Sequence, residues 1–368
     1  MKELWISLFV LIIFSSCYQN KRGVECYKKT ENLLEITVKD QRNEVNIGEY
    51  LDSVNILPLK MNKGDYLYAI DKLIITKNRI HILDIKQNSV YSFTKEGDFI
   101  NKVSKLGRGS EEYPNISDFS IDGDTVIIFN RDVVYRYDVS GKYYGKVKLN
   151  FVANKMECIN GNYAFYRGYN TSFKDYEYYY NLIVTDKNGD IVSKNFPYTK
   201  DAMGIGSVFC RNGEKINFVS IENNTIYEFD DYEPIPHVAI HFAEPENKNE
   251  TSFISNFRET KHSITFDIVG GNAGTAMVSK LDSSSLVLNK RKADDDYIFI
   301  GASPYAVYDN KVFSILESYE YKIMMEDEPV IYSSIKEHYP QYETVFNLIK
   351  SENANPVLIM ETYKETYQ

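Results

Sequence analysis

The sequence predicts an all-β protein, and three observations lead to this fold class. First, aromatic residues are abundant, with 31 Tyr and 20 Phe among 368 residues, and aromatic side chains favour strands. Second, many short runs alternate apolar and polar residues, as half-buried strands do. Third, these runs are separated by turns rich in Gly, Asp and Asn, which suit tight reversals between antiparallel strands.

The strand-like runs recur with a period of about 45 residues. Each repeat ends in a hairpin made of a strand, a tight turn and another strand, and two further strand-like runs precede it. The hairpins begin at Tyr91, Tyr135, Ile183, Tyr227 and, in a weaker form, Met277. Four antiparallel strands in a repeat of this length are typical of one blade of a β-propeller.

A sixth unit begins near Pro304 and ends in the strand PVLIMETYK at the carboxy terminus, but it lacks one strand. The run SVNILPL, residues 53–59, precedes the first blade and has no partners of its own. Pairing these two runs would close the ring and remove both sheet edges. We therefore expect one domain over residues 33–368, a six-bladed β-propeller of four-stranded antiparallel blades.

A long insertion, residues 318 to about 355, interrupts the last blade. Five apolar residues in it fit a helical stripe: Ile335, Tyr342, Val345, Phe346 and Ile349. We expect a short helix, which either packs on its own propeller or serves as a lid or a partner-binding element.

The amino terminus predicts a lipoprotein. Residues 4–14, LWISLFVLIIF, form an apolar run of signal-peptide length, well below the ~20 residues of a membrane-spanning helix. Ser15 and Ser16 then precede Cys17, a pattern that resembles the bacterial lipobox, in which the cysteine is acylated and becomes the first mature residue. The alternative is an ordinary secretory signal with an incidental cysteine.

The expected organisation is a signal peptide at 1–16, lipidation at Cys17 and a polar tether at 17–32, which together hold the propeller at a membrane of the bacterial cell envelope. The residues after Cys17 lack the acidic cluster of a surface-export signal, which favours the outer membrane with the protein facing the periplasm. Cys26, Cys158 and Cys210 would remain after processing. Cys158 and Cys210 lie in apolar strands and are predicted to be core residues rather than a bridge.

The most specific family resemblance is carried by LGRGSEEYPNISDFSID, residues 106–122. It is similar to the GRGxxEY segment between the first two blades of the six-bladed β-propeller lipoproteins of Bacteroidota, relatives of NHL-repeat propellers. Residues 57–59 and 355–360 resemble the opening and closing strands of that family, although Ser110-Glu111 stands where the family usually has Pro-Gly. The resemblance implies an envelope-anchored propeller, often encoded near nutrient-uptake systems, and no agreed reaction.

In such blades the turns between the second and third strands share one face with the crossovers between blades, and we call this the crossover face. The longer loops are expected there, and it is the predicted binding face. Arg108, between Gly107 and Gly109, is a candidate for binding an anion or carboxylate, and Glu112 and Tyr113 of the same segment are further candidate ligand-binding residues. Alternatively, Arg108 pairs with Glu112 and holds the crossover, while Tyr113 packs against the neighbouring blade.

A tyrosine-rich loop, residues 168–179, supplies the second candidate. Tyr rings with an apolar face and a polar tip suit sugars and peptides. The alternative is that half of these side chains point into the blade core, because a strand buries every second side chain. The candidate binding residues of this loop and its flanks are Arg167, Tyr169 and Tyr176, with Tyr166 and Tyr178 beside them.

Metal and catalytic interpretations are weaker. His237 and His241 are four residues apart on a strand, about 13 Å from each other, so they are not expected to bind one ion together. Asp294–Asp296 lacks the spacing of a calcium loop, and no nucleophile motif occurs. No cofactor is required, although a cation in the central channel is an open alternative.

The net charge of −10 argues against nucleic-acid binding. The function that the sequence favours is a non-catalytic scaffold that binds a glycan, a peptide or a partner protein on the crossover face. The alternatives are a metal-assisted hydrolase or lyase with its site in the central channel, and a structural subunit of an outer-membrane uptake assembly.

Overall fold

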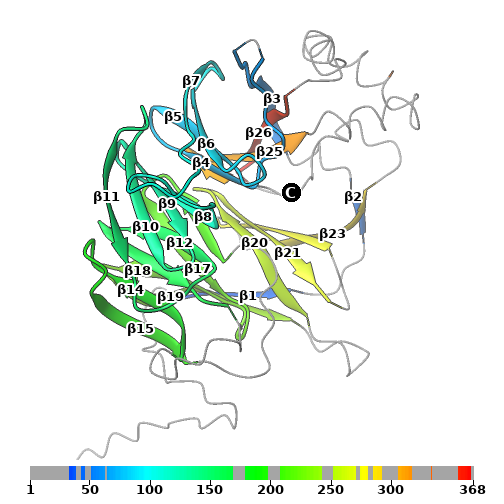
Figure 1. The fold of residues 1–368 in the computed structure, drawn as a ribbon. Coiled ribbons are helices and arrows are strands. Elements are labelled where there is room, and N and C mark those ends of the chain that lie inside the picture. The colour runs from blue at the N-terminus through cyan, green and yellow to red at the C-terminus, as the bar shows by residue number, and fades with distance from the viewer. Residues whose placement is uncertain are drawn as a thin grey trace, which may run out of the picture.

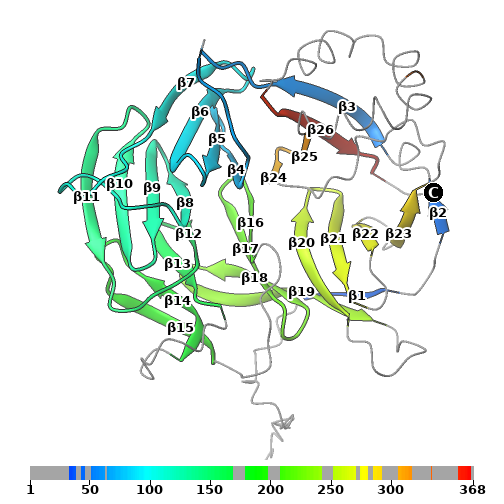
Figure 2. The ribbon, with the colours of Figure 1, turned by 45° about the vertical axis from the view of Figure 1, so that its right-hand side comes forward.

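The computed structural model describes residues 33–38, 43–45, 51–62, 64–168, 179–197, 208–242, 252–270, 274–280, 285–291, 306–316, 333 and 355–365. Every named element in these ranges is a β-strand, as the aromatic and alternating sequence predicts. The sheets stand side by side around a central axis (Figure 1). Figure 2 shows β11 and β15 at the periphery and β4, β16, β20 and β24 toward the centre.

Three sheets are antiparallel blades of four consecutive strands. The first contains β4 (Lys72–Ile75), β5 (Arg79–Asp84), β6 (Ser89–Thr94) and β7 (Phe99–Val103). The second contains β8 (Asp118–Asp122), β9 (Thr125–Asn130), β10 (Val133–Asp138) and β11 (Tyr143–Lys148). The third contains β12 (Lys155–Ile159), β13 (Asn162–Tyr166), β14 (Tyr180–Thr185) and β15 (Ile191–Pro197).

The remaining strands form two larger sheets. The five-stranded sheet contains β20 (Phe253–Glu259), β21 (Ser263–Val269), β22 (Gly274–Ser279), β23 (Ser285–Arg291) and β2 (Asn43–Val45). The nine-stranded sheet contains β16 (Phe209–Asn212), β17 (Lys215–Ser220), β18 (Thr225–Asp230), β19 (Glu233–Phe242), β24 (Ala306–Tyr308), β25 (Lys311–Leu316), β26 (Val357–Tyr363), β3 (Leu51–Pro58) and β1 (Leu34–Val38).

The structure therefore has four discrete blades rather than the six separate blades that the sequence predicts. The strands expected to form the fourth and sixth blades are joined in the nine-stranded sheet, because β16 and β24 form a parallel bridge between Asn212 and Val307. Sequence periodicity describes strands within a blade and carries no information on such a contact between inner strands. The helix expected in the insertion lies outside the described residues, apart from Ser333, and is not confirmed.

The pairing of the two ends of the propeller is confirmed. Strand β3 runs antiparallel to β26, with Pro58 opposite Val357 and Ile56 opposite Ile359. Each of these strands would otherwise leave an unpaired edge, and pairing satisfies their backbone groups. The last four-stranded unit thus combines strands from opposite ends of the chain.

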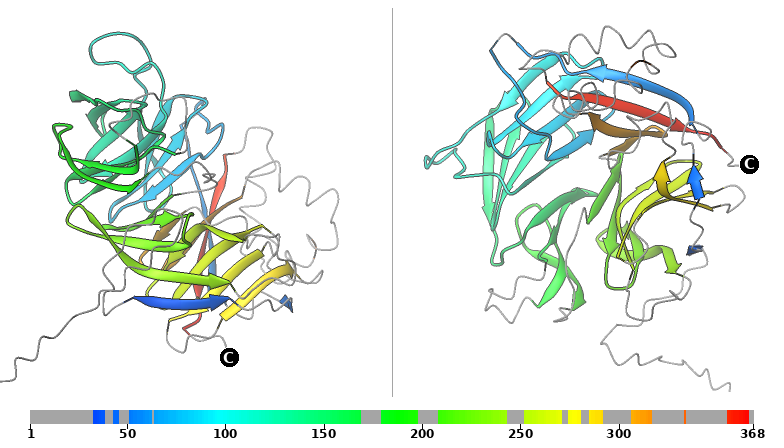
Figure 3. Two further views of the ribbon diagram at one scale, coloured as in Figure 1. Left: turned by 90° about the horizontal axis from the view of Figure 1, so that it is seen from below. Right: turned by 90° about the vertical axis from the view of Figure 1, so that its right-hand side faces the viewer.

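Two short strands near the amino terminus, β1 and β2, were not predicted, and we call them the N-terminal strap. Strand β1 pairs in parallel with β19, and β2 pairs in parallel with β23. Figure 3 shows β1, in dark blue, beside the sheet that contains β19. Ile36 and Val38 are buried in a core cluster with Val238 and Ile240. The strap therefore covers two outer edges of the propeller and adds to its core.

Aromatic side chains fill the spaces between neighbouring blades. Phe129 of β9 lies 5.2 Å from Phe165 of β13, centroid to centroid, and Phe151 lies 5.3 Å from the same ring. Five tyrosines are among the largest fully buried side chains: Tyr91, Tyr113, Tyr137, Tyr163 and Tyr227. The tyrosine excess therefore reflects, in large part, packing between blades.

The crossover face has a recurring connection. In three blades the turn between the second and third strands contains a residue with positive φ, namely Asn88 (50°), Arg131 (53°) and Asn224 (50°). Asn88 Oδ1 accepts a hydrogen bond from the Ile116 amide at 3.1 Å, and Asn224 Oδ1 accepts one from the Ile254 amide at 3.1 Å. Arg131 accepts one through its carbonyl, from the Ala153 amide at 2.8 Å. These turns therefore hold the crossover to the next blade, as the predicted loop arrangement requires.

Candidate functional site

The GRG segment on the first crossover is a tight turn held by Glu112. The Glu112 carboxylate accepts a hydrogen bond from the Gly109 amide at 2.8 Å. A Cβ atom at position 107 would lie 1.9 Å from Glu112 Oε2, so glycine there leaves room for the Glu112 carboxylate in its present position. Arg108 is exposed at the tip of this turn and stays a candidate for ligand binding.

Tyr113 is a packing residue between blades. Its side chain is fully buried, 0% exposed, and its ring contacts Tyr135 and Tyr137 edge to face. Its hydroxyl accepts a hydrogen bond from the Lys105 amide at 2.9 Å and donates one to the Asn88 carbonyl at 3.0 Å. Burial raises the pKa of Tyr113 to about 12, so the hydroxyl stays protonated. Tyr113 joins the crossover to the first blade rather than facing solvent.

Arg167 begins the tyrosine-rich loop and is buried, 6% exposed. Its Nε donates to the Val152 carbonyl at 3.0 Å, which ties the end of β13 to the preceding crossover. Tyr166 is also buried and packs against Phe218. Tyr169, Tyr176 and Tyr178 lie outside the described residues, as do Cys17 and Asp294–Asp296. The structure places Glu112 and Tyr113 together on one crossover, whereas Arg167 belongs to another blade.

An exposed aromatic patch on the crossover face was missed in the sequence. Tyr66 and Tyr68 are each 52% exposed, and Ile85 beside them is 36% exposed. Gln87 Nε2 donates to the Tyr66 carbonyl at 2.8 Å, and Lys86 Nζ lies 3.3 Å from the centroid of the Tyr68 ring. The signal was present in Tyr66-Leu67-Tyr68, where the apolar Leu67 is buried and the tyrosine on each side of it is exposed. We call Tyr66, Tyr68 and Ile85 the tyrosine patch.

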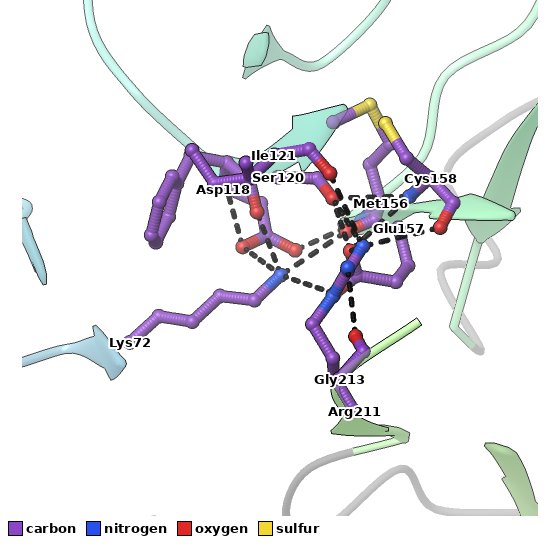
Figure 4. Close-up of polar contacts among 10 residues, drawn as sticks. Lys72, Asp118, Ser120, Ile121, Met156, Glu157, Cys158, Arg211 and Gly213 are labelled. Carbon is purple, nitrogen blue, oxygen red and sulfur yellow. Dashed lines mark hydrogen bonds and ion pairs between the residues drawn. The ribbon is translucent and has the colours of Figure 1, made fainter. Parts of the chain in front are cut away.

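A charged cluster occupies the axis of the propeller, and it was also missed. It consists of Lys72, Asp118, Glu157 and Arg211, one from each of the inner strands β4, β8, β12 and β16, and we call it the channel cluster (Figure 4). Lys72 Nζ lies 3.0 Å from Asp118 Oδ1 and 3.2 Å from Glu157 Oε2. Arg211 Nη2 lies 2.8 Å from Glu157 Oε1. Charged residues within the otherwise apolar first strands of the predicted blades were the usable signal.

Further hydrogen bonds satisfy the channel cluster. Lys72 Nζ donates to the Phe119 carbonyl at 2.7 Å and to the Met156 carbonyl at 3.2 Å. Ser120 Oγ donates to Glu157 Oε1, and Arg211 Nη2 donates to the Cys158 carbonyl at 3.2 Å. The cluster thus ties four inner strands together at the axis (Figure 4).

The electrostatics of the channel cluster keep Lys72, Glu157 and Arg211 charged. Burial alone would raise the pKa of Glu157, but Lys72 and Arg211 lower it to about 2. Burial alone would lower the pKa of Lys72, but Asp118 and Glu157 raise it instead. Neither group exchanges protons near neutral pH, so neither suits general acid–base catalysis there.

The free space beside the channel cluster is small. A cavity of ≈ 40 Å³ is lined by inner-strand residues that include Lys72, Glu157 and Arg211. Typical small-molecule sites have volumes of about 300–1,000 Å³. This part of the axis therefore suits a water molecule or a small ion rather than an organic substrate.

Cys158 and Cys210 are free and buried, as predicted for core residues. Burial raises the pKa of the Cys158 thiol to about 12, so it is not a reactive thiolate. His237 and His241 do not share a site, because His237 contacts Glu228 and Glu259 and His241 is exposed. Among the described residues, no helix has the length and apolar character needed to cross a bilayer.

Taken together, the fold and site define a β-propeller whose axis is occupied by an ion network. The chain belongs to the family described as a domain of unknown function, DUF4934, whose model matches residues 33–361. No curated protein shows significant sequence similarity to it.

Two solved structures from Bacteroides illustrate the likeness of fold. A presumed exported protein of Bacteroides fragilis superposes with a TM-score of 0.71 at 16% identity, covering 90% of this chain and 99% of that one. A member of the DUF4221 family from Bacteroides vulgatus has a TM-score of 0.46 at 8% identity, covering 85% of this chain and 97% of that one. The first of these supports the overall fold.

Proposed function

We propose that the protein is a non-catalytic, lipid-anchored binding scaffold that presents its crossover face to a glycan, a peptide or a partner protein. The tyrosine patch carries this proposal, because exposed aromatic rings beside long loops suit ligands with both apolar and polar surfaces. Arg108, exposed on the same face, adds a group for a carboxylate or another anion.

The channel cluster supports a binding role over catalysis. A channel metal would need carboxylate oxygens, but both oxygens of Glu157 face cations, Lys72 and Arg211. An incoming ion would have to displace both cations, whose side chains are 21% and 10% exposed and each make further hydrogen bonds to backbone carbonyls, and breaking such pairs is costly. We therefore rank a metal-assisted hydrolase or lyase with its site at the axis below the scaffold.

We also propose that the nine-stranded sheet counts as two blades, which makes the protein a six-bladed propeller of the NHL-like lipoprotein type. Its two antiparallel runs, β16–β19 and β24–β25–β26–β3, are each complete four-stranded units. The bridge between them is one residue pair, whereas strands within each run share several. Because a single bridge joins the two four-stranded units, each unit can still pack against its neighbours as a separate blade.

Export and anchoring rest on the lipobox-like Cys17, and the presumed exported protein of Bacteroides fragilis is in keeping with that assignment. We place the protein at the outer membrane of a bacterial envelope, facing the periplasm. Cys17→Ala should shift the protein from the membrane fraction to the soluble fraction. Trp5 is the one tryptophan of the chain and lies in the segment to be removed, so the mature protein should show no Trp emission.

Arrays of glycans and peptides, together with pull-down of envelope proteins, test the binding role. Tyr66→Ala with Tyr68→Ala should weaken binding at least tenfold, about 1.4 kcal/mol, and Arg108→Ala should weaken anionic ligands further. Tyr232→Ala is the matched control, because Tyr232 is a 37% exposed tyrosine in a turn on the opposite face. Binding that survives the crossover-face variants and is lost with Tyr232→Ala would overturn the proposed site. Capture of one stoichiometric partner would instead favour a structural subunit of an uptake assembly.

A further inference from the structure

A second polar cluster lies on the face opposite the crossover face, where the nine-stranded and five-stranded sheets meet. Glu228 of β18, His237 of β19 and Glu259 of β20 converge there. His237 Nε2 lies 3.0 Å from Glu228 Oε1 and 2.9 Å from Glu259 Oε2. Two carboxylates from different sheets therefore face the same imidazole nitrogen.

The spacing of these atoms is close to that of metal ligands. The three donor atoms lie within 4.8 Å of one another. In a tetrahedral zinc site, bonds of about 2.0–2.1 Å place the ligand atoms roughly 3.3 Å apart. Small movements of the side chains would bring one nitrogen and two oxygens to such a shell.

The site also contains an oxygen without a partner. Asn217 of β17 is buried, 4% exposed, and its Nδ2 donates to Glu259 Oε2 at 3.2 Å. Its Oδ1 has no hydrogen-bond partner within the described part of the chain. A buried acceptor without a donor is costly. Rotation of the Asn217 side-chain amide by about half a turn would exchange Oδ1 and Nδ2 and so direct the oxygen toward the cluster.

Two lysines contact the same carboxylates but can leave them. Lys280 Nζ lies 2.8 Å from Glu259 Oε1, and Lys215 contacts Glu228. Their side chains are 30% and 46% exposed, whereas that of Glu259 is 6% exposed. The Glu259 carboxylate is thus buried, whereas the long lysine stems allow both ammonium groups to turn toward water.

We propose that Glu228, His237 and Glu259, with Asn217 as a further oxygen donor, form a binding site for a first-row divalent cation, with Zn²⁺ as the preferred ion. Imidazole with carboxylates selects zinc-like ions, whereas Mg²⁺ and Ca²⁺ prefer shells made of oxygen alone. A bound ion would cross-link β18 and β19 to β20 and so fasten the two sheets together. The site is independent of the proposed ligand-binding face.

The test is a titration of chelator-treated protein with Zn²⁺, followed by calorimetry and thermal unfolding. We expect one ion per chain and a rise in Tm, since binding to the folded state stabilises it. Mg²⁺ and Ca²⁺ at the same concentrations should leave Tm unchanged.

His237→Gln should weaken Zn²⁺ binding at least about a hundredfold, because it removes a direct ligand. His241→Gln is the matched control, four residues along the same strand and exposed, and should bind as the wild type does. Lys215→Met with Lys280→Met should tighten binding about tenfold or more, since two competing cations are gone. This variant also keeps the test informative if His237→Gln folds poorly.

Absence of one-to-one Zn²⁺ binding in both the wild type and the lysine variant would overturn the site. Unchanged affinity in a folded His237→Gln protein would overturn it as well, as would loss of binding in His241→Gln alone.

Discussion

Arg211 Nη2 donates a hydrogen bond to Glu157 Oε1 at 2.8 Å, so an inner strand of the nine-stranded sheet is tied to the inner strand of the third blade. The same carboxylate reaches Lys72 of the first blade through its other oxygen. One buried glutamate thus connects three sheets at the axis (Figure 4). Its stabilising role gives the first prediction.

Glu157→Gln should lower the free energy of unfolding by about 3–5 kcal/mol, because it leaves two buried cations without half of their counter-charge. Urea unfolding followed by circular dichroism measures this change. Asp98→Asn is the matched control: Asp98 pairs with Lys60, but both side chains are more than half exposed, so the loss should stay below about 1 kcal/mol. Equal effects from the two substitutions would contradict a special role for the axis.

His81 should make the protein sensitive to mild acid. The side chain is 1% exposed, and burial together with Arg79 and Arg211 lowers its pKa to about 4. The folded state therefore binds this proton less readily than the unfolded state, whose pKa is about 6.5. Stability should be complete above pH 6.5 and fall by about 3 kcal/mol as the pH decreases to 4.

His81→Asn should flatten this part of the pH profile, which thermal unfolding at half-unit steps of pH would show. His241→Gln, at an exposed position, should leave the slope unchanged. Glu157, with its pKa lowered to about 2, contributes to a different window, because its stabilisation is lost as the pH falls from about 4.5 to 2. An unaltered slope between pH 6.5 and 4 in His81→Asn would show that other groups cause the acid sensitivity.

Asn88 should be sensitive to substitution for two separable reasons. Its φ of 50° disfavours residues other than Gly, Asn and Asp by about 1 kcal/mol, and its side-chain hydrogen bond to the Ile116 amide contributes about 1 kcal/mol. Asn88→Ala should therefore cost about 2 kcal/mol, while Asn88→Gly should cost about half as much. Chemical denaturation of both variants gives the comparison, and equal losses would mean that backbone strain has no part.

The N-terminal strap should contribute measurably to stability. Ile36 is 6% exposed and packs in a core cluster, so Ile36→Ala should cost about 2–4 kcal/mol. Glu35→Ala is the neighbouring control, since Glu35 is exposed on the same strand. Hydrogen exchange should also speed up along β19 in Ile36→Ala. Unchanged exchange there would show that the strap does not protect that edge.

The sequence predicted those parts of the fold that depend on local chemistry. The Gly and Asp turns place the hairpins of the blades, and the apolar runs at 53–59 and 356–364 pair because each would otherwise leave an unpaired edge. The strap was missed, since Asn43–Val45 is too short and polar to differ from a linker. The pairing of the strap depends on the free edges of β19 and β23, which exist only in the folded structure.

The candidate sites were predicted less well, for a geometric reason. Arg108 lies on the expected face, but Tyr113 and Arg167 are buried, because a repeat shows that side chains alternate without showing which neighbour covers them. Lys72 and Glu157 are far apart in sequence and meet at the axis. Such contacts arise when the ring of blades closes, and the periodicity of the sequence does not predict which residues then meet.

The N-terminal strap also has a consequence for the order of assembly. Strands β1 and β2 dock on β19 and β23, and β3 completes a sheet with the last strand of the chain. The strands synthesised first are therefore the last to find partners, and loop closure over most of the chain makes that step slow. Until then the ring stays open, because its closing pair needs the last strand of the chain, β26, as well as β3.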